Sequence, residues 1–169
     1  MVKFIGEYDA RLDDKGRVVV PSAFKSIVSE SLKIEKARIN AEIGLKTEDS
    51  EGEEIRFVLK KDLFANCLNM FTYEQWDKES EQVRSRLNLF RREDAAWYRE
   101  YMMDRALVTL DRKVGRIIIP RQLLAKVGIT KDIVFAGNDY KIEIWSKENY
   151  GKNRLSEDEF TSLTEKLLG

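Results

Sequence analysis

Two stretches of the sequence decide the fold: LDDKGRVVVPSAF at residues 12–24 and LDRKVGRIIIPRQLL at residues 110–124. In each, a glycine and an arginine precede three β-branched residues and a proline, and Gly16 and Gly115 lie 99 positions apart. Self-similarity of this kind indicates one supersecondary unit that occurs twice. The sequence therefore predicts an internal repeat.

The ends of the two copies are also alike, since CLNMFTYEQWDK from Cys67 is similar to KIEIWSKENYGK from Lys141, 74 positions later. Because the two offsets differ by 25 residues, the first copy contains an insertion, which we place within residues 28–56. Its composition is rich in Glu, Lys and Ser, and charged segments of this kind are usually solvated. We expect an extended hairpin or a solvated loop around residues 49–52.

The residue pattern of each copy predicts a strand, a tight turn, a second strand and a short helix, followed by further strands. The glycine of each turn can supply the positive φ of a tight hairpin, and the β-branched triplets are typical of buried strands. The first strands are expected at residues 4–11 and 106–110, the short helices at 22–28 and 121–127, and two closing strands around 137–139. About 45 ordered residues rarely bury enough surface to fold alone, so we expect the copies to pack on each other.

Between the copies, residues 72–106 contain neither Pro nor Gly and place apolar residues at helical spacing. We expect two helices with a break near Arg92, and a C-terminal helix over residues 155–168 in which Ser156 and Glu159 form a capping box. The predicted fold class is α+β, in four segments. These are a first repeat at residues 1–76 with the insertion near 28–56, a helical spacer at 77–104, a second repeat at 105–150 and the C-terminal helix at 151–169.

The composition excludes several classes of function. The chain has no histidine, which removes the commonest general base and every histidine-containing metal site. Its single cysteine, Cys67, cannot form an internal disulfide or a thiolate cluster, and no carboxylates gather at strand ends to hold Mg²⁺. We therefore expect no catalytic residue, no metal and no cofactor. The lone thiol and the early charged residues favour a cytoplasmic protein without a membrane segment.

The thirty basic and thirty acidic side chains leave a formal net charge of zero, so only a local asymmetry of charge can attract a polyanion. Residues 104–131 provide such an asymmetry, since seven basic residues outnumber two acidic ones there. This segment contains the second of the two repeated turns.

The repeated turn itself contains a candidate DNA contact. Asp13 and Arg17 are four residues apart across the first turn, so the carboxylate can fold back and hold the guanidinium. A β-hairpin fits the major groove of DNA, where an oriented arginine can bind guanine and a neighbouring lysine can bind phosphate. The same residues suit any hairpin turn, because Asp, Lys and Gly are favoured there. A DNA-reading role and a purely structural role both remain open at this point.

The doubled turn, the apolar triplet and proline after it, the closing strand with its aromatic end and the helical spacer resemble the MraZ family. The resemblance covers nearly the whole chain except the insertion. It implies the AbrB-like swapped-hairpin class, with two pseudo-repeated β-hairpin and short-helix units that form a small barrel-like core. It also implies a bacterial transcription regulator, cytoplasmic and nucleoid-associated, that we expect to be a repressor of the division and cell-wall gene cluster. Such a protein forms a ring-shaped homo-oligomer and binds short direct repeats of double-stranded DNA in its own promoter.

The family's Asp-x-x-x-Arg motif, which the resemblance implies to face DNA, matches Asp13 and Arg17. In the second copy, Asp111 and Arg116 are five residues apart, a departure that either redirects Arg116 or leaves the contact to its neighbours. The candidate DNA-binding residues are Asp13, Lys15, Arg17, Asp111, Arg112, Lys113 and Arg116.

Two other functions use the same residues. An antitoxin-like DNA-binding module has such hairpins, although it usually has one copy and a disordered tail. A scaffold oligomer that binds only protein would use the Asp and Arg turns for subunit contacts. If the protein binds DNA, we expect affinity to fall steeply with added salt, because contacts to phosphates release counterions.

Overall fold

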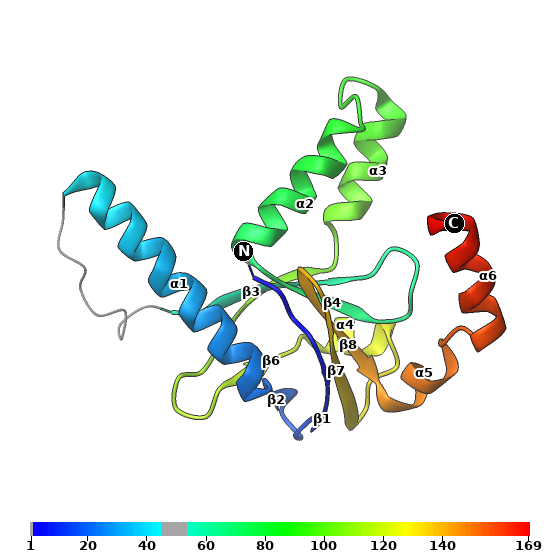
Figure 1. Ribbon diagram of the computed structural model, residues 1–169, viewed down its shortest axis with the longest axis horizontal. Helices are drawn as coiled ribbons and strands as arrows, with labels where there is room; N and C mark the ends of the chain where they lie inside the picture. Colours follow the sequence, from blue (N-terminus) through cyan, green and yellow to red (C-terminus); the bar gives the residue numbers. More distant parts are fainter. Residues whose placement is uncertain (1, 45–53) are drawn as a thin grey trace.

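The computed structural model describes residues 2–44 and 54–169 (Figure 1). The first half of the chain contains β1 (Glu7–Arg11), β2 (Arg17–Val19), α1 (Ser22–Ile43), β3 (Arg56–Lys61), β4 (Leu68–Thr72) and α2 (Tyr73–Ser85). After α3 (Arg92–Met102), the second half contains β5 (Arg105–Thr109), β6 (Arg116–Ile118), α4 (Arg121–Lys126), β7 (Asp132–Asn138), β8 (Lys141–Ser146), α5 (Lys147–Lys152) and α6 (Glu157–Leu168). The described residues form a mixed α+β fold in which the order strand, strand, helix, strand, strand, helix occurs twice.

Within the described residues, six antiparallel strands form the main sheet in the order β1, β7, β8, β4, β3, β5, and β2 pairs with β6 in a separate two-stranded ribbon. The first strand of each half pairs with the third strand of the other half. In this way β1 pairs with β7, where Glu7 lies opposite Ala136, and β5 pairs with β3, where Thr109 lies opposite Arg56. Each half of the described chain therefore needs the other to complete the sheet.

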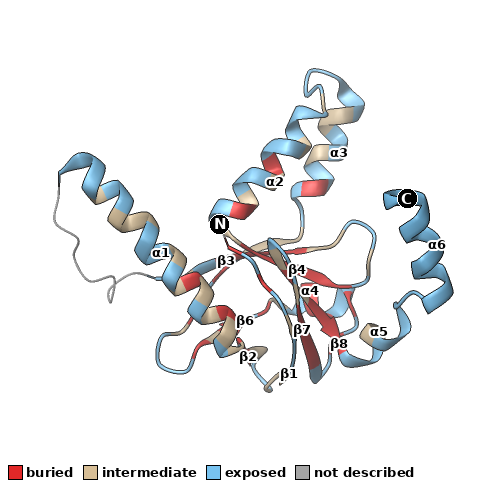
Figure 2. Cartoon of the chain, viewed as in Figure 1, coloured by how far each residue is buried: buried red, intermediate tan, exposed pale blue. Residues whose placement is uncertain are grey.

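The larger hydrophobic core joins the ribbon to one face of the sheet. Side chains alternate across a strand, so Val18 and Ile117 at the centre of the ribbon point inward, and each is 1% exposed. They pack with buried residues from both halves, among them Phe24, Phe57, Leu59, Met70, Leu123, Ile133, Phe135 and Ile144. Figure 2 shows that the buried residues are concentrated in the strands, with few along the projecting helices. The core thus fixes the position of the ribbon on the sheet.

The first helix corrects the prediction for residues 22–28, because α1 continues to Ile43. No Pro or Gly occurs between Pro21 and Gly44, and the segment is rich in Ala, Glu and Lys, which propagate a helix readily. The helix ends where Gly44 adopts a left-handed φ of 77°. The insertion therefore begins as about four further helical turns, and not as a hairpin or loop. The loop expected at residues 49–52 lies outside the described residues.

The other predicted helices are confirmed. α2 is the last element of the first half, and α3, which begins at Arg92, lies between the two halves. At the start of α6, Ser156 Oγ accepts the N–H of Glu159 at 3.1 Å and the N–H of Ser156 donates to the Glu159 carboxylate at 3.3 Å, which is the expected capping box.

A further helix, α5, was not predicted. Its N-cap residue, Ser146, corresponds to Thr72 at the start of α2, and each side chain accepts the N–H of the residue three positions later.

α1, the α2–α3 pair and α6 project from the sheet in three different directions (Figure 1). Across residues 2–44 and 54–169, no helix combines the length and the apolar composition needed to cross a bilayer.

Candidate nucleic-acid interface

The β2–β6 ribbon carries two arginines and two apolar side chains on one side. Its register places Arg17 opposite Ile118, and Val19 opposite Arg116. Because alternate residues of a strand point to opposite faces, these four side chains form the face that does not pack on the core. Val19 is 48% exposed and Ile118 is 60% exposed, and about a third of each arginine side chain is accessible. We call this surface the outer ribbon face.

In the first turn, one carboxylate organises both the backbone and the arginine. Asp13 Oδ1 accepts the backbone N–H of Lys15 at 2.9 Å and that of Arg17 at 2.8 Å, while Asp13 Oδ2 accepts the Nε–H of Arg17 at 2.6 Å. Gly16, with a φ of 77°, donates its N–H to the Asp13 carbonyl at 3.1 Å. Charge-assisted hydrogen bonds are shorter and stronger than neutral ones, so the Arg17 guanidinium is held in a defined orientation.

The second turn keeps this arrangement with one more residue. Asp111 Oδ1 accepts the N–H of Lys113 at 2.9 Å, and Asp111 Oδ2 lies 3.1 Å from Nη2 and 3.4 Å from Nε of Arg116. The N–H of Asp111 donates to the carbonyl of Arg116 at 2.8 Å, just as the N–H of Asp13 donates to the carbonyl of Arg17 at 2.9 Å. The additional residue is therefore accommodated inside the loop, and Arg116 stays with its aspartate.

Two reciprocal hydrogen bonds hold the turns against each other. The N–H of Ile119 donates to the Gly16 carbonyl and the N–H of Val20 donates to the Gly115 carbonyl, both at 2.9 Å. A Cβ atom at Gly16 would lie 3.2 Å from the Ile119 carbonyl oxygen, so a side chain there would press on the neighbouring backbone. The two arginines are thus presented by one hydrogen-bonded unit rather than by two independent loops.

Hydrogen bonds lower the pKa of both turn carboxylates. The backbone N–H of Arg17, with contributions from its guanidinium and from the N–H of Lys15, lowers the pKa of Asp13 below its ordinary value of 3.8. The N–H of Lys113 and the guanidinium of Arg116 lower the pKa of Asp111 in the same way. Both carboxylates are therefore ionised at neutral pH. A guanidinium has five N–H donors, so each arginine can bind its aspartate and still donate to a ligand.

The remaining candidate residues lie at the tips of the turns. Lys15, Arg112 and Lys113 are all exposed. Exposed cations beside a ribbon suit contacts to phosphate, which position a protein on the duplex without reading its sequence. The structure thus brings all seven candidate residues together around the ribbon.

The positive charge of residues 104–131 does not all lie at this ribbon. The Arg105 guanidinium carbon lies 4.3 Å from the ring centroid of Trp76 and 4.0 Å from that of Tyr101, so this cation stacks on rings of α2 and α3. Lys126 forms an ion pair with Asp104. The basic surface is therefore smaller than the sequence count implies, because proximity along the chain does not decide which side of the fold a residue occupies.

One basic residue beside the ribbon was missed in the sequence. Lys25, in the first turn of α1, lies against the second ribbon turn, since a Cβ atom at Gly115 would be 3.3 Å from its Nζ. It lines a hollow of about 560 Å³ together with Val19 and Val114. The equivalent position in the second half, 99 residues later, holds Leu124, which is 6% exposed. This difference between the two copies was visible in the sequence and singles out Lys25.

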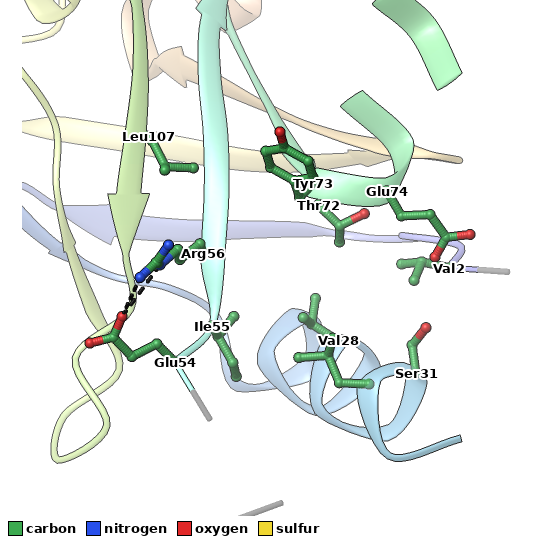
Figure 3. Close-up of a pocket in the computed structure, with 11 residues that line it drawn as sticks. Val2, Val28, Ser31, Glu54, Ile55, Arg56, Thr72, Tyr73, Glu74 and Leu107 are labelled. Atoms are coloured by element: carbon green, nitrogen blue, oxygen red, sulfur yellow. Dashed lines mark hydrogen bonds and ion pairs between the residues drawn. The ribbon is translucent and has the colours of Figure 1, made fainter. Parts of the chain in front are cut away.

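A second hollow, of about 570 Å³, lies between α1 and the edge of the sheet formed by β3 and β5 (Figure 3). Val28, Ile55 and Leu107 contribute apolar walls, and Arg56 Nη2 forms an ion pair with Glu54 at 2.9 Å. No residue of the outer ribbon face lines this hollow. Its apolar character suits a protein side chain better than a polyanion.

Asp62, Cys67 and Glu143 are the described residues whose potential metal-ligand atoms lie within 4.8 Å of one another. Asp62 Oδ2 already accepts the backbone N–H groups of Phe64 and Ala65 at 2.9 and 2.8 Å. Burial raises the pKa of the Cys67 thiol, whereas a metal ligand must be a thiolate. This cluster is therefore better explained by its internal hydrogen bonds than by a metal ion.

Comparison with known proteins gives consistent matches over nearly the whole chain. A family model described as "MraZ protein, putative antitoxin-like" matches residues 102–168. Two relatives are named transcriptional regulator MraZ. The protein from Bacteroides thetaiotaomicron is 33% identical over 99% of this chain and 94% of its own length. The protein from Bacteroides fragilis is 30% identical over 99% of this chain and 92% of its own length. The protein of that name from Lachnoclostridium phytofermentans is 35% identical over 89% of this chain and 86% of its own length.

Proposed function

The chain belongs to the MraZ family, and from that premise we propose that it is a sequence-specific DNA-binding transcription regulator that reads duplex DNA with the outer ribbon face. The observation that carries the proposal is the pair of arginines, Arg17 and Arg116, each bound by its own aspartate. A two-stranded ribbon is narrow enough to enter the major groove. An arginine that is already oriented loses less conformational entropy when it binds a base.

The spacing of the two arginines suits the base pairs of a duplex. Arg17 lies opposite Ile118, two residues along the strand from Arg116, so the arginines are diagonal neighbours. Diagonal neighbours are about 7–8 Å apart, which is close to two base-pair steps of about 3.4 Å. Each guanidinium can then bind one guanine edge with two hydrogen bonds, which contributes about 1–3 kcal/mol of discrimination against another base. Lys15 and Lys113 contact phosphates on either side.

The fold is of the AbrB-like swapped-hairpin class, with two pseudo-repeated units around a small barrel-like core. The pairing of β1 with β7 and of β5 with β3 supports this assignment, because each hairpin donates a strand to the other unit. The two units span residues 1–76 and 105–150, the helical spacer spans 77–104, and the C-terminal helix spans 151–169.

The protein works as a ring-shaped homo-oligomer, so that several ribbons bind short direct repeats at once. Linked sites gain affinity without new contacts when their spacing matches. α6 supports assembly, because all of its residues are exposed in the single chain (Figure 2), including Phe160, Leu163 and Leu167 on one face. Helices of this length are only marginally stable alone in water, so packing against another copy would stabilise α6. The apolar hollow between α1 and β5 is a surface that could receive it.

The target is the protein's own promoter, upstream of the division and cell-wall gene cluster, where binding represses transcription in the cytoplasm at the nucleoid. This mechanism has no catalytic step and uses no cofactor. The matched family model is described as antitoxin-like, which supports a second candidate function. In that function the chain is a DNA-binding module that also binds a toxin protein. A stable complex with a second protein, copurified in constant ratio, would distinguish that function.

A gel-shift titration tests the proposal. The full-length protein is titrated against the DNA upstream of its own gene and against scrambled DNA of the same composition, at two salt concentrations. We expect stepwise shifts specific to the upstream DNA, which added salt weakens and which need clearly more protein in Arg17→Ala, because the variant loses a contact of about 1–3 kcal/mol. Arg38→Ala is the matched control, because Arg38 is exposed on α1 and pairs with Glu35. An intact oligomer that shifts neither DNA would favour a scaffold that binds only protein.

A further inference from the structure

The outer ribbon face contains two apolar side chains that the core does not need. Val19 and Ile118 are 48% and 60% exposed, while Val18 and Ile117, their neighbours on the inner face, are almost fully buried. β-branched residues favour strands, but threonine would satisfy that preference without exposing an apolar surface. Valine and isoleucine at these two positions give the face apolar groups directly beside its two arginines.

We propose that Val19 and Ile118 contact the C5-methyl groups of thymines in the major groove and so contribute to sequence preference. This inference rests on the proposed function. Thymine is the base that presents a methyl group in the major groove, and apolar side chains recognise it by direct contact. The class of ligand is duplex DNA with thymines next to the bases that the arginines read.

The register supports DNA, rather than another protein, as the occupant of this face. Val19 lies directly opposite Arg116, and Ile118 lies directly opposite Arg17. Directly opposite Cβ atoms are about 4.5–5.5 Å apart, which exceeds one base-pair step of about 3.4 Å. An arginine and the apolar residue opposite it therefore reach neighbouring base pairs. The flanking cations complement the charge of a polyanion and would oppose burial in an apolar protein interface.

The test replaces thymidine by deoxyuridine, which lacks the C5-methyl group. Duplexes from the DNA upstream of the gene carry this replacement at one position at a time, and affinity is measured by fluorescence anisotropy. Because a buried methyl group contributes about 0.8 kcal/mol, we expect affinity to fall about fourfold at each contacted thymine. The double variant Val19→Ala, Ile118→Ala should bind thymine and deoxyuridine duplexes equally at those positions.

Ile34→Ala is the matched control, because Ile34 is a β-branched residue of α1 with 64% exposure and belongs neither to the ribbon nor to the apolar hollow. It should keep the full difference between thymine and deoxyuridine. Equal affinity of the unaltered protein for every duplex would overturn the inference while leaving DNA binding intact, whereas failure to bind any duplex would overturn the proposed function first. A double variant that keeps the fourfold difference, or that instead changes the oligomer mass, would show that these side chains do not read the methyl groups.

Discussion

Replacement of Gly16 by alanine tests whether the ribbon turns require their observed conformation. Gly16 has a φ of 77°, and an added Cβ would lie 3.2 Å from the Ile119 carbonyl oxygen. The left-handed conformation costs an alanine about 1–2 kcal/mol, and the backbone contact adds overpacking, so we expect the free energy of unfolding to fall by about 2–3 kcal/mol in total. Gly44→Ala separates the two effects, because Gly44 has the same φ and no atom within 4 Å of its added Cβ.

Urea unfolding, followed by tryptophan fluorescence at one fixed protein concentration, measures both variants. With a slope of about 2 kcal/mol per molar urea, the midpoint of unfolding of Gly16→Ala should lie about 1 M urea below that of the unaltered protein. The midpoint of Gly44→Ala should shift clearly less. Gly16→Ala should also bind DNA more weakly under folding conditions, because Gly16 lies between Lys15 and Arg17. Equal stability of the two variants, or unchanged DNA affinity of Gly16→Ala, would refute the description of the turn.

Four further predictions address other parts of the molecule. Arg116→Ala should weaken duplex binding as much as Arg17→Ala, by about 1–3 kcal/mol in an anisotropy titration; unchanged affinity would mean that the second turn does not read DNA. Lys25→Ala should make the plot of log affinity against log salt less steep, by about 0.9 for each phosphate that the lysine no longer neutralises. Lys33→Ala, which changes an exposed lysine of the same helix, should leave the slope unchanged. Burial opposes ionisation of Asp62, but the N–H groups of Ala65 and Phe64 and the amide of Asn69 prevail and lower its pKa to about 2. The ionised form of Asp62 therefore stabilises the fold above pH 3.8, and this effect is lost as the pH falls towards 2. Asp62→Asn should lower the free energy of unfolding by about 1–2 kcal/mol at pH 7 and by little at pH 2. An equal loss at both values of pH, measured by urea unfolding, would contradict this. Leu163→Glu should lower the oligomer mass in light scattering without changing the circular dichroism of the chain; an unchanged mass would exclude α6 from the subunit contacts.

Local features of the fold could be predicted from the sequence because their causes are local. The Ser156 and Glu159 side chains form the capping box expected of them, and the turn aspartates hold their arginines as the spacing of Asp13 and Arg17 indicated. The first strand was predicted from residue 4, but β1 begins at Glu7, after Gly6 with its positive φ of 107°.

Features that depend on distant parts of the chain could not be predicted in this way. The exchange of strands brings Glu7 beside Ala136, and no pattern near either residue specifies the other. Arg105 was counted in the basic segment of residues 104–131, which contains the second repeated turn, yet it stacks on Trp76 and Tyr101. The length of α1 was misjudged because a charged composition was taken to mean a loop, although the segment has no helix-breaking residue before Gly44.

The central claim is that the outer ribbon face reads DNA, and the most direct test is a structure of the full-length protein bound to the DNA upstream of its own gene, at a resolution that shows side chains. We expect β2 and β6 in the major groove, with the guanidinium groups of Arg17 and Arg116 within hydrogen-bond distance of base edges. Their contacts to Asp13 and Asp111 should be retained. A complex in which the ribbon faces solvent or a neighbouring subunit, while another surface contacts the bases, would contradict this account.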